Sequence, residues 1–114
     1  IGAGNNAVDV LLYDGSAEPD ISNILTVGTW TMLTWVNDGG TLKIYKDGVE
    51  KYSGASSITA VKGLYLGAGC WDQAFQGTFD EVSLFGSTAL TDVQVKGLYK
   101  SVADASEQPE TPTE

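Results

Sequence analysis

The stretch TLKIYKDGVEKYSG, residues 41–54, decides the fold. Asp47 and Gly48 separate two strand-like segments, and this dipeptide is typical of a type I′ turn, in which both central residues take a positive φ. Before the turn, Leu42 and Ile44 share one face of the expected strand, and the residues between them point to the other face. The stretch therefore predicts an antiparallel β-hairpin.

Further strand-like runs lie on both sides of this hairpin, separated by Gly, Asp and Asn. They are AVDVLLYDG (7–15), ISNILTVG (21–28), TWTMLTWVNDGG (29–40), KGLYLGAGC (62–70) and GTFDEVSLFG (77–86). Short strands with turn residues between them favour two packed antiparallel sheets over a parallel sheet with crossover helices. The sequence therefore predicts an all-β fold, an antiparallel β-sandwich.

One segment near the C-terminus has a helical pattern instead. Thr91 is suited to cap the helix, and Gln94 follows three residues later, as in a capping box. Apolar residues then recur at helical spacing, at Val95, Leu98 and Tyr99. The pattern predicts one short C-terminal helix over residues 91–99.

The length of 114 residues fits one small domain. Residues 101–114 contain two prolines, four acids and few bulky apolar side chains, a composition that is typical of linkers and tails. We therefore expect a sandwich domain over residues 1–100, followed by an acidic tail.

The charge balance excludes several classes of partner and site. Fifteen acids face six cations, all of them Lys, for a net charge of −9. Binding to phosphate backbones and anionic membranes depends on Lys and Arg, so we expect no nucleic-acid partner. No apolar run is long enough to span a bilayer, so membrane insertion is not expected. Because the chain has no His and one Cys, it cannot form a Ser-His-Asp triad or a Cys-His pair.

Two adjacent acids, Asp80 and Glu81, raise the question of glycoside hydrolysis. In the strand expected over residues 77–86, neighbouring side chains point to opposite faces. Carboxylates on opposite faces cannot flank one glycosidic bond at the roughly 5–5.5 Å or 6.5–9.5 Å that hydrolysis requires. We therefore predict that the pair is not catalytic and that the chain is not an enzyme.

The two acids then need separate explanations. Asp80 shares its expected face with Val82 and Leu84, which we interpret as the face between the sheets. A carboxylate there either accepts hydrogen bonds from backbone N–H groups or binds a metal ion, because an isolated buried charge is very costly. Glu81 is expected on the solvated face.

Trp71 lies in the loop GAGCWDQAFQG (67–77), where no strand period governs it. With Asp72 and Gln73 beside it, the loop combines a flat apolar face with polar groups, the combination that sugar recognition uses. The alternative is that Trp71 closes one end of the sandwich core. The candidate ligand-binding residues are Trp71, Asp72 and Gln73.

Three motifs in succession resemble a known family. They are GTWTMLTWVNDGGTLKIYKDGVEKYSG (28–54), LYLGAG (64–69) and FQGTFDEVSLFGSTALTDVQVKGLY (75–99). Together they are similar to the laminin-G-like, concanavalin A-like lectin/glucanase jelly-roll domain, over roughly residues 26–99 and in the family's order.

The resemblance implies a non-catalytic binding or adhesion module that recognises a glycan or a protein surface. The parent protein is then expected to be extracellular or at a cell or virion surface. The alternative is a structural or assembly module, such as a virion decoration domain or a cell-surface spacer. The strands that family members carry before AVDVLLYDG are absent, so we expect an open sheet edge or exposed apolar face that a neighbouring chain covers.

The resemblance also implies calcium. In the pentraxin relatives of this sandwich, the loop that corresponds to residues 67–76 supplies acidic and amide ligands to calcium. The matching residues here are Asp72 and Gln73, with Asp80 or water completing the shell. One or two carboxylates imply a single weak site, with a Kd on the order of 10⁻⁴–10⁻³ M.

Overall fold

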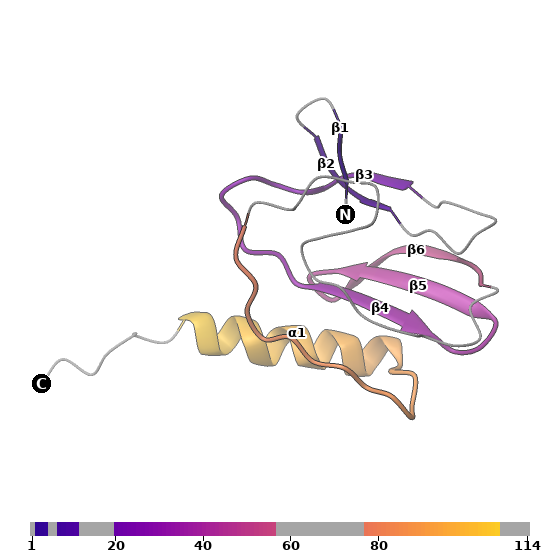
Figure 1. Ribbon diagram of the computed structural model, residues 1–114. Helices are drawn as coiled ribbons and strands as arrows, with labels where there is room; N and C mark the ends of the chain where they lie inside the picture. The colour runs from indigo at the N-terminus through magenta and orange to yellow at the C-terminus, as the bar shows by residue number, and fades with distance from the viewer. Residues whose placement is uncertain (1, 5–6, 12–19, 57–76, 108–114) are drawn as a thin grey trace, which may run out of the picture.

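The structure is a computed structural model that describes residues 2–4, 7–11, 20–56 and 77–107 (Figure 1). Side-chain burial is described for residues 24–56 and 77–104. Its elements are β1 (Gly2–Gly4), β2 (Ala7–Leu11), β3 (Asp20–Leu25), β4 (Leu33–Asn37), β5 (Thr41–Lys46), β6 (Val49–Ala55) and α1 (Asp92–Glu107). The strands form two antiparallel three-stranded sheets, in the orders β1-β2-β3 and β4-β5-β6. The predicted antiparallel sandwich with one C-terminal helix is confirmed.

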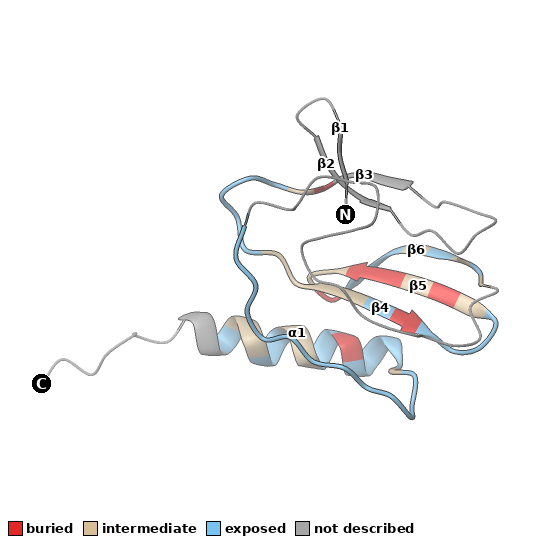
Figure 2. Cartoon of the chain, viewed as in Figure 1, coloured by how far each residue is buried: buried red, intermediate tan, exposed pale blue. Residues whose placement is uncertain are grey.

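The sheet β4–β6 lies between the sheet β1–β3 and the helix α1 (Figure 1). On one face, Leu42 and Ile44 of β5 pack with Ile24 of β3. On the other face, Tyr45 of β5 and Val36 of β4 pack with Val95 of α1. The central strand β5 is therefore buried from both sides, which Figure 2 shows along its length.

The predicted hairpin turn is confirmed. Asp47 and Gly48 have φ values of 51° and 80°, so both central residues have the positive φ that a type I′ turn requires. The turn joins β5 to β6, with Lys46 paired to Val49. The Asp47 carboxylate also accepts a 2.9 Å hydrogen bond from the N–H of Met32, which fixes the turn to the segment before β4.

The start of α1 agrees with the sequence, but its length does not. The N–H of Gln94 donates to Thr91 Oγ1 at 3.2 Å, and the N–H of Thr91 donates to Gln94 Oε1 at 2.9 Å, so the capping box is present. The helix continues to Glu107, and an end at residue 99 was therefore wrong. Half of the added residues KSVADASE, a Lys, two Ala and a Glu, are good helix formers, and the first proline comes only at residue 109. Residues 101–107 of the expected tail are thus helical.

The strand predicted over residues 77–86 is not present. This segment has no regular secondary structure, and all of its residues are exposed. Asp80 Oδ1 accepts a 2.8 Å hydrogen bond from the N–H of Glu81, and Glu81 has a φ of 53°. A local bond of this kind competes with a strand ladder, and a positive φ interrupts an extended chain. The expected strand over residues 62–70 lies outside the described residues.

Candidate functional site

The candidate residues from the sequence fall into two groups: some lie outside the described residues, and the others are described. Trp71, Asp72 and Gln73 lie outside the described residues, and their roles stay predictions. Asp80 is described and is exposed, so the expectation that it lies buried between the sheets was wrong. Glu81 is exposed, as expected.

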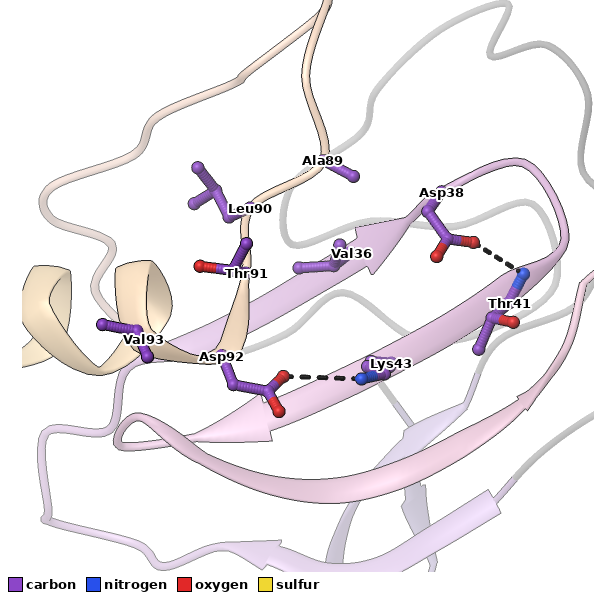
Figure 3. A pocket seen from close by; sticks show the side chains of 9 residues that line it. All are labelled: Val36, Asp38, Thr41, Lys43, Ala89, Leu90, Thr91, Asp92 and Val93. Atoms are coloured by element: carbon purple, nitrogen blue, oxygen red, sulfur yellow. Dashed lines mark hydrogen bonds and ion pairs between the residues drawn. The ribbon is translucent and has the colours of Figure 1, made fainter.

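The structure itself offers a groove of about 530 Å³, which we call the β4–β5/α1 groove (Figure 3). It lies where the outer face of β4 and β5 meets the segment that enters α1. Its lining residues are Val36, Asp38, Thr41, Lys43, Ala89, Leu90, Thr91, Asp92 and Val93.

The sheet side of the groove follows from strand register and turn chemistry. Val36 and Lys43 are paired across β4 and β5, so both side chains project from the outer face. In the turn between these strands, Asp38 Oδ1 accepts hydrogen bonds from the N–H of Thr41 at 2.9 Å and of Gly40 at 3.4 Å. This turn fixes Asp38 at the end of the groove near Thr41 (Figure 3).

The helix side of the groove is held by the capping box and by Val95. Thr91 caps α1, and the fully buried side chain of Val95 packs on Val36 and Tyr45, with Leu90 against the same cluster. This packing brings the first helical residue, Asp92, over β5.

A polar cluster then joins α1 to the sheet. Lys43 Nζ lies 3.4 Å from Asp92 Oδ1 and 3.4 Å from Glu50 Oε1. The hydroxyl of Tyr45 donates a hydrogen bond to Asp92 Oδ1. Asp92 therefore receives hydrogen bonds from two side chains of β5.

These contacts shift the pKa values of the cluster. The hydrogen bond from Tyr45, with the positive charge of Lys43, lowers the pKa of Asp92. The pKa of Lys43 is raised, chiefly by its hydrogen bond with Glu50 and then by the charge of Asp92. Burial, followed by the hydrogen bond to Asp92, raises the pKa of Tyr45 to about 12.

The lowered pKa of Asp92 does not suit this carboxyl group to donate a proton as a general acid. A general acid in a glycosidase needs a raised carboxyl pKa, and the pKa of Asp92 is shifted in the opposite direction. Carboxylates and threonine hydroxyls around the apolar side chains of Val36 and Leu90 offer hydrogen bonds at the rim and an apolar floor.

Sequence reasoning missed this site for a specific reason. The alternation in β5 does place Lys43 and Tyr45 on the face opposite Leu42 and Ile44. Asp92 lies over this face only because α1 docks there. The alternation of residues in a strand does not predict where a helix docks. The available signal was Tyr45, because a large aromatic side chain on the outer face indicates that another element packs on that face.

The described residues do not provide a metal site. Among them, no group of three or more His, Cys, Asp or Glu side chains is placed to hold an ion. Asp80 Oδ1 is already used by the N–H of Glu81. The calcium expectation for Asp72 and Asp80 stays a prediction, because Asp72 lies outside the described residues. In the described part of the chain, no helix has the length and apolarity to cross a membrane.

The pKa of Tyr45 predicts a loss of stability at high pH. The folded chain holds the phenol proton more tightly than the unfolded chain, in which the pKa of Tyr is about 10. This contribution is complete below about pH 10 and is lost as the pH rises through about 12. A shift of this size corresponds to about 2–3 kcal/mol of the free energy of unfolding.

Urea unfolding of the wild type and of Tyr45→Phe across this pH range checks the prediction. We expect the wild type to lose stability more steeply, because the variant has no phenol to ionise at this position. Ultraviolet titration of the same two proteins reports the missing phenol directly. If the phenol that Tyr45→Phe removes from the titration curve ionises near pH 10, the burial and bonding of Tyr45 are contradicted.

Comparison with known proteins supplies the family. The chain matches the laminin-G-like family described as the concanavalin A-like lectin/glucanases superfamily over residues 3–96, a range that includes β2 to β6, most of β1 and the start of α1. Neither a curated protein nor a solved structure matches the chain significantly. The match covers most of the chain, and the antiparallel strands agree with the β-sandwich of that superfamily. The chain therefore belongs to the concanavalin A-like lectin/glucanase superfamily, as a laminin-G-like domain.

Proposed function

We propose that the chain is a non-catalytic binding module that recognises a glycan, and that the β4–β5/α1 groove is its binding site. The observation that carries the proposal is the composition of the groove. The lining combines the side chains of Asp38, Asp92, Thr41 and Thr91 with the apolar side chains of Val36, Ala89, Leu90 and Val93. A sugar ring has the matching chemistry, with hydroxyl groups at its edge and C–H groups on its faces.

The family supports this proposal at a coarser level, since the superfamily suggests a carbohydrate-binding or protein-binding module. Glycan recognition also fits the extracellular, cell-surface or virion-surface location that we propose for the parent protein. The lowered pKa of Asp92 is opposite in direction to the raised pKa that a glycosidase general acid needs.

A variant that fills the groove tests the assignment. Ala89 lines the groove and is exposed, so Ala89→Trp is expected to occupy the space with little effect on the core. We expect the variant to lose at least tenfold in affinity for oligosaccharides that bind the wild type, measured by isothermal titration calorimetry.

Ser87→Trp is the matched control, because Ser87 is exposed in the same segment and does not line the groove. The control is expected to bind like the wild type. Equal binding by the wild type and both variants would place the glycan site elsewhere on the chain.

Calcium assistance through the loop around Trp71, Asp72 and Gln73 is a separate proposal, supported by the resemblance to calcium-binding relatives. A calcium-dependent rise in melting temperature that is lost in Asp72→Ala would support it. If calcium has no effect on the wild type, this loop holds no ion that matters for stability.

A second candidate function, assembly with a neighbouring protein chain, is favoured by exposed apolar side chains. Val82, Leu84 and Phe85 are 55%, 79% and 55% exposed within the segment that lacks a strand. Isolated exposed apolar residues are ordinary, but three within four positions suggest a protein contact. Sedimentation of the wild type and of Leu84→Ser, each together with the neighbouring chains of its parent protein, measures whether this segment contributes to association.

A further inference from the structure

The charges that line the β4–β5/α1 groove indicate which class of glycan it takes. Two carboxylates, Asp38 and Asp92, and one ammonium group, Lys43, line the groove, so one negative charge is in excess. The whole chain carries a net charge of −9 and contains no Arg. The field around the groove is therefore negative, and it repels acidic sugars and attracts cationic ones.

The ammonium group of Lys43 is already neutralised by two partners. It lies 3.4 Å from Asp92 and 3.4 Å from Glu50, and both carboxylates raise its pKa. A sulfate or uronate that approached Lys43 would have to displace a carboxylate or accept its repulsion. Lys43 is thus a poor anchor for an acidic glycan.

Asp38 is in the opposite situation. Its Oδ1 accepts backbone hydrogen bonds from Gly40 and Thr41, which fix the position of the carboxylate. Among the described residues, no ammonium group lies within ion-pair distance of Asp38, because the ion pairs found there are those of Lys43. The structure therefore holds a positioned carboxylate at the groove that has no cationic partner within the described part of the chain.

We infer that the groove selects glycans that carry an unsubstituted amino group, such as oligomers of glucosamine, over neutral and acidic glycans. This inference rests on the proposed function of the groove. The ammonium group of the sugar would pair with Asp38, its hydroxyl groups would bond to Thr41 and Thr91, and its apolar face would lie on Val36. Acidic sugars would be rejected by the excess negative charge.

Three soluble oligosaccharides of equal length serve as probes: a glucosamine oligomer with free amines, its N-acetylated counterpart and a uronic acid oligomer. Calorimetric titration is carried out at a pH at which the amines are protonated. An exposed ion pair contributes about 0.2–1 kcal/mol, so we expect the free-amine oligomer to bind about 1.4- to 5-fold more tightly than the N-acetylated one. The uronic acid oligomer is expected to bind most weakly. The preference for the amine should shrink in high salt.

Asp38→Asn identifies the group responsible. The side-chain oxygen of Asn still accepts the hydrogen bond from Thr41, so the turn is retained while the charge is removed. We expect this variant to lose the preference for the free amine, so that it binds the free-amine and N-acetylated oligomers with equal affinity. Asp104→Asn is the matched control, because it makes the same change in net charge at an exposed position of α1 outside the groove.

The outcomes separate this inference from the function on which it rests. If the wild type binds all three oligomers equally, or if the amine preference survives Asp38→Asn, the inference is wrong and glycan binding stands. If Asp104→Asn removes the preference as well, overall charge rather than Asp38 selects the amine, which also overturns the inference. If no oligosaccharide binds the wild type, both the inference and the proposed function fail.

Discussion

Replacing Ile44 with Ala is expected to lower the free energy of unfolding by about 2–5 kcal/mol, because the change removes a buried side chain and leaves a cavity. Ile44 is fully buried and packs with Leu42 and with Ile24 of the other sheet, so it contributes to the contact that joins the two layers. Small domains are stabilised by roughly 5–15 kcal/mol in total. The loss is therefore a large part of the stability of this chain.

Two further variants show whether the loss comes from the cavity. Ile44→Val removes one methylene and is expected to cost about 0.5–1.5 kcal/mol. Val49→Ala removes apolar atoms from a side chain that is half exposed in the adjacent strand β6, and we expect a change within about 0.5 kcal/mol. Urea unfolding of the three variants gives the comparison. Equal losses from Ile44→Ala and Val49→Ala would contradict the packing between the sheets.

Replacing Gly48 with Ala is expected to lower the free energy of unfolding by at least 2 kcal/mol, for two reasons that add. The first is the φ of 80°, which costs a residue with a side chain about 1–2 kcal/mol. The second is crowding by α1, because an added Cβ would lie 3.2 Å from Tyr99 Cβ and 3.3 Å from Lys96 Cα. The helix backbone at Lys96 cannot move aside without disturbing the docking of α1.

Gly39→Ala separates the two reasons. Gly39 has a φ of 93°, and an added Cβ there meets nothing within 4 Å, so this variant has the backbone strain without the crowding. We expect a loss of about 1–2 kcal/mol from Gly39→Ala and a clearly larger loss from Gly48→Ala in the same urea experiment. Equal losses would show that α1 does not press on the β5–β6 turn.

The features that could be predicted from the sequence are those that neighbouring residues determine. Asp47 and Gly48 form the expected turn because two adjacent residues with positive φ specify it. Thr91 and Gln94 form the expected capping box because both hydrogen bonds are made within four residues. The alternation in β5 likewise placed Leu42 and Ile44 on the face that packs on the other sheet.

The features that could not be predicted depend on competition between local hydrogen bonds and strand pairing, or on where α1 docks on the sheet. Residues 77–86 alternate like a strand, but the hydrogen bond between Asp80 and the N–H of Glu81 is available to the chain locally, and this segment forms no strand. The groove depends on where α1 lies across the sheet. That position is fixed by Val95 and Asp92 through contacts with residues far away in the chain.

The central claim is that this laminin-G-like domain binds a glycan in the β4–β5/α1 groove. Titration of the isotopically labelled chain with a glucosamine oligomer, followed by two-dimensional NMR, tests it most directly. We predict chemical-shift changes concentrated at Val36, Thr41, Leu90 and Thr91, with the backbone amide of Val49, which is exposed in β6, unaffected. No changes with this oligomer, its N-acetylated counterpart or the uronic acid oligomer, or changes confined to residues outside the groove, would contradict the claim.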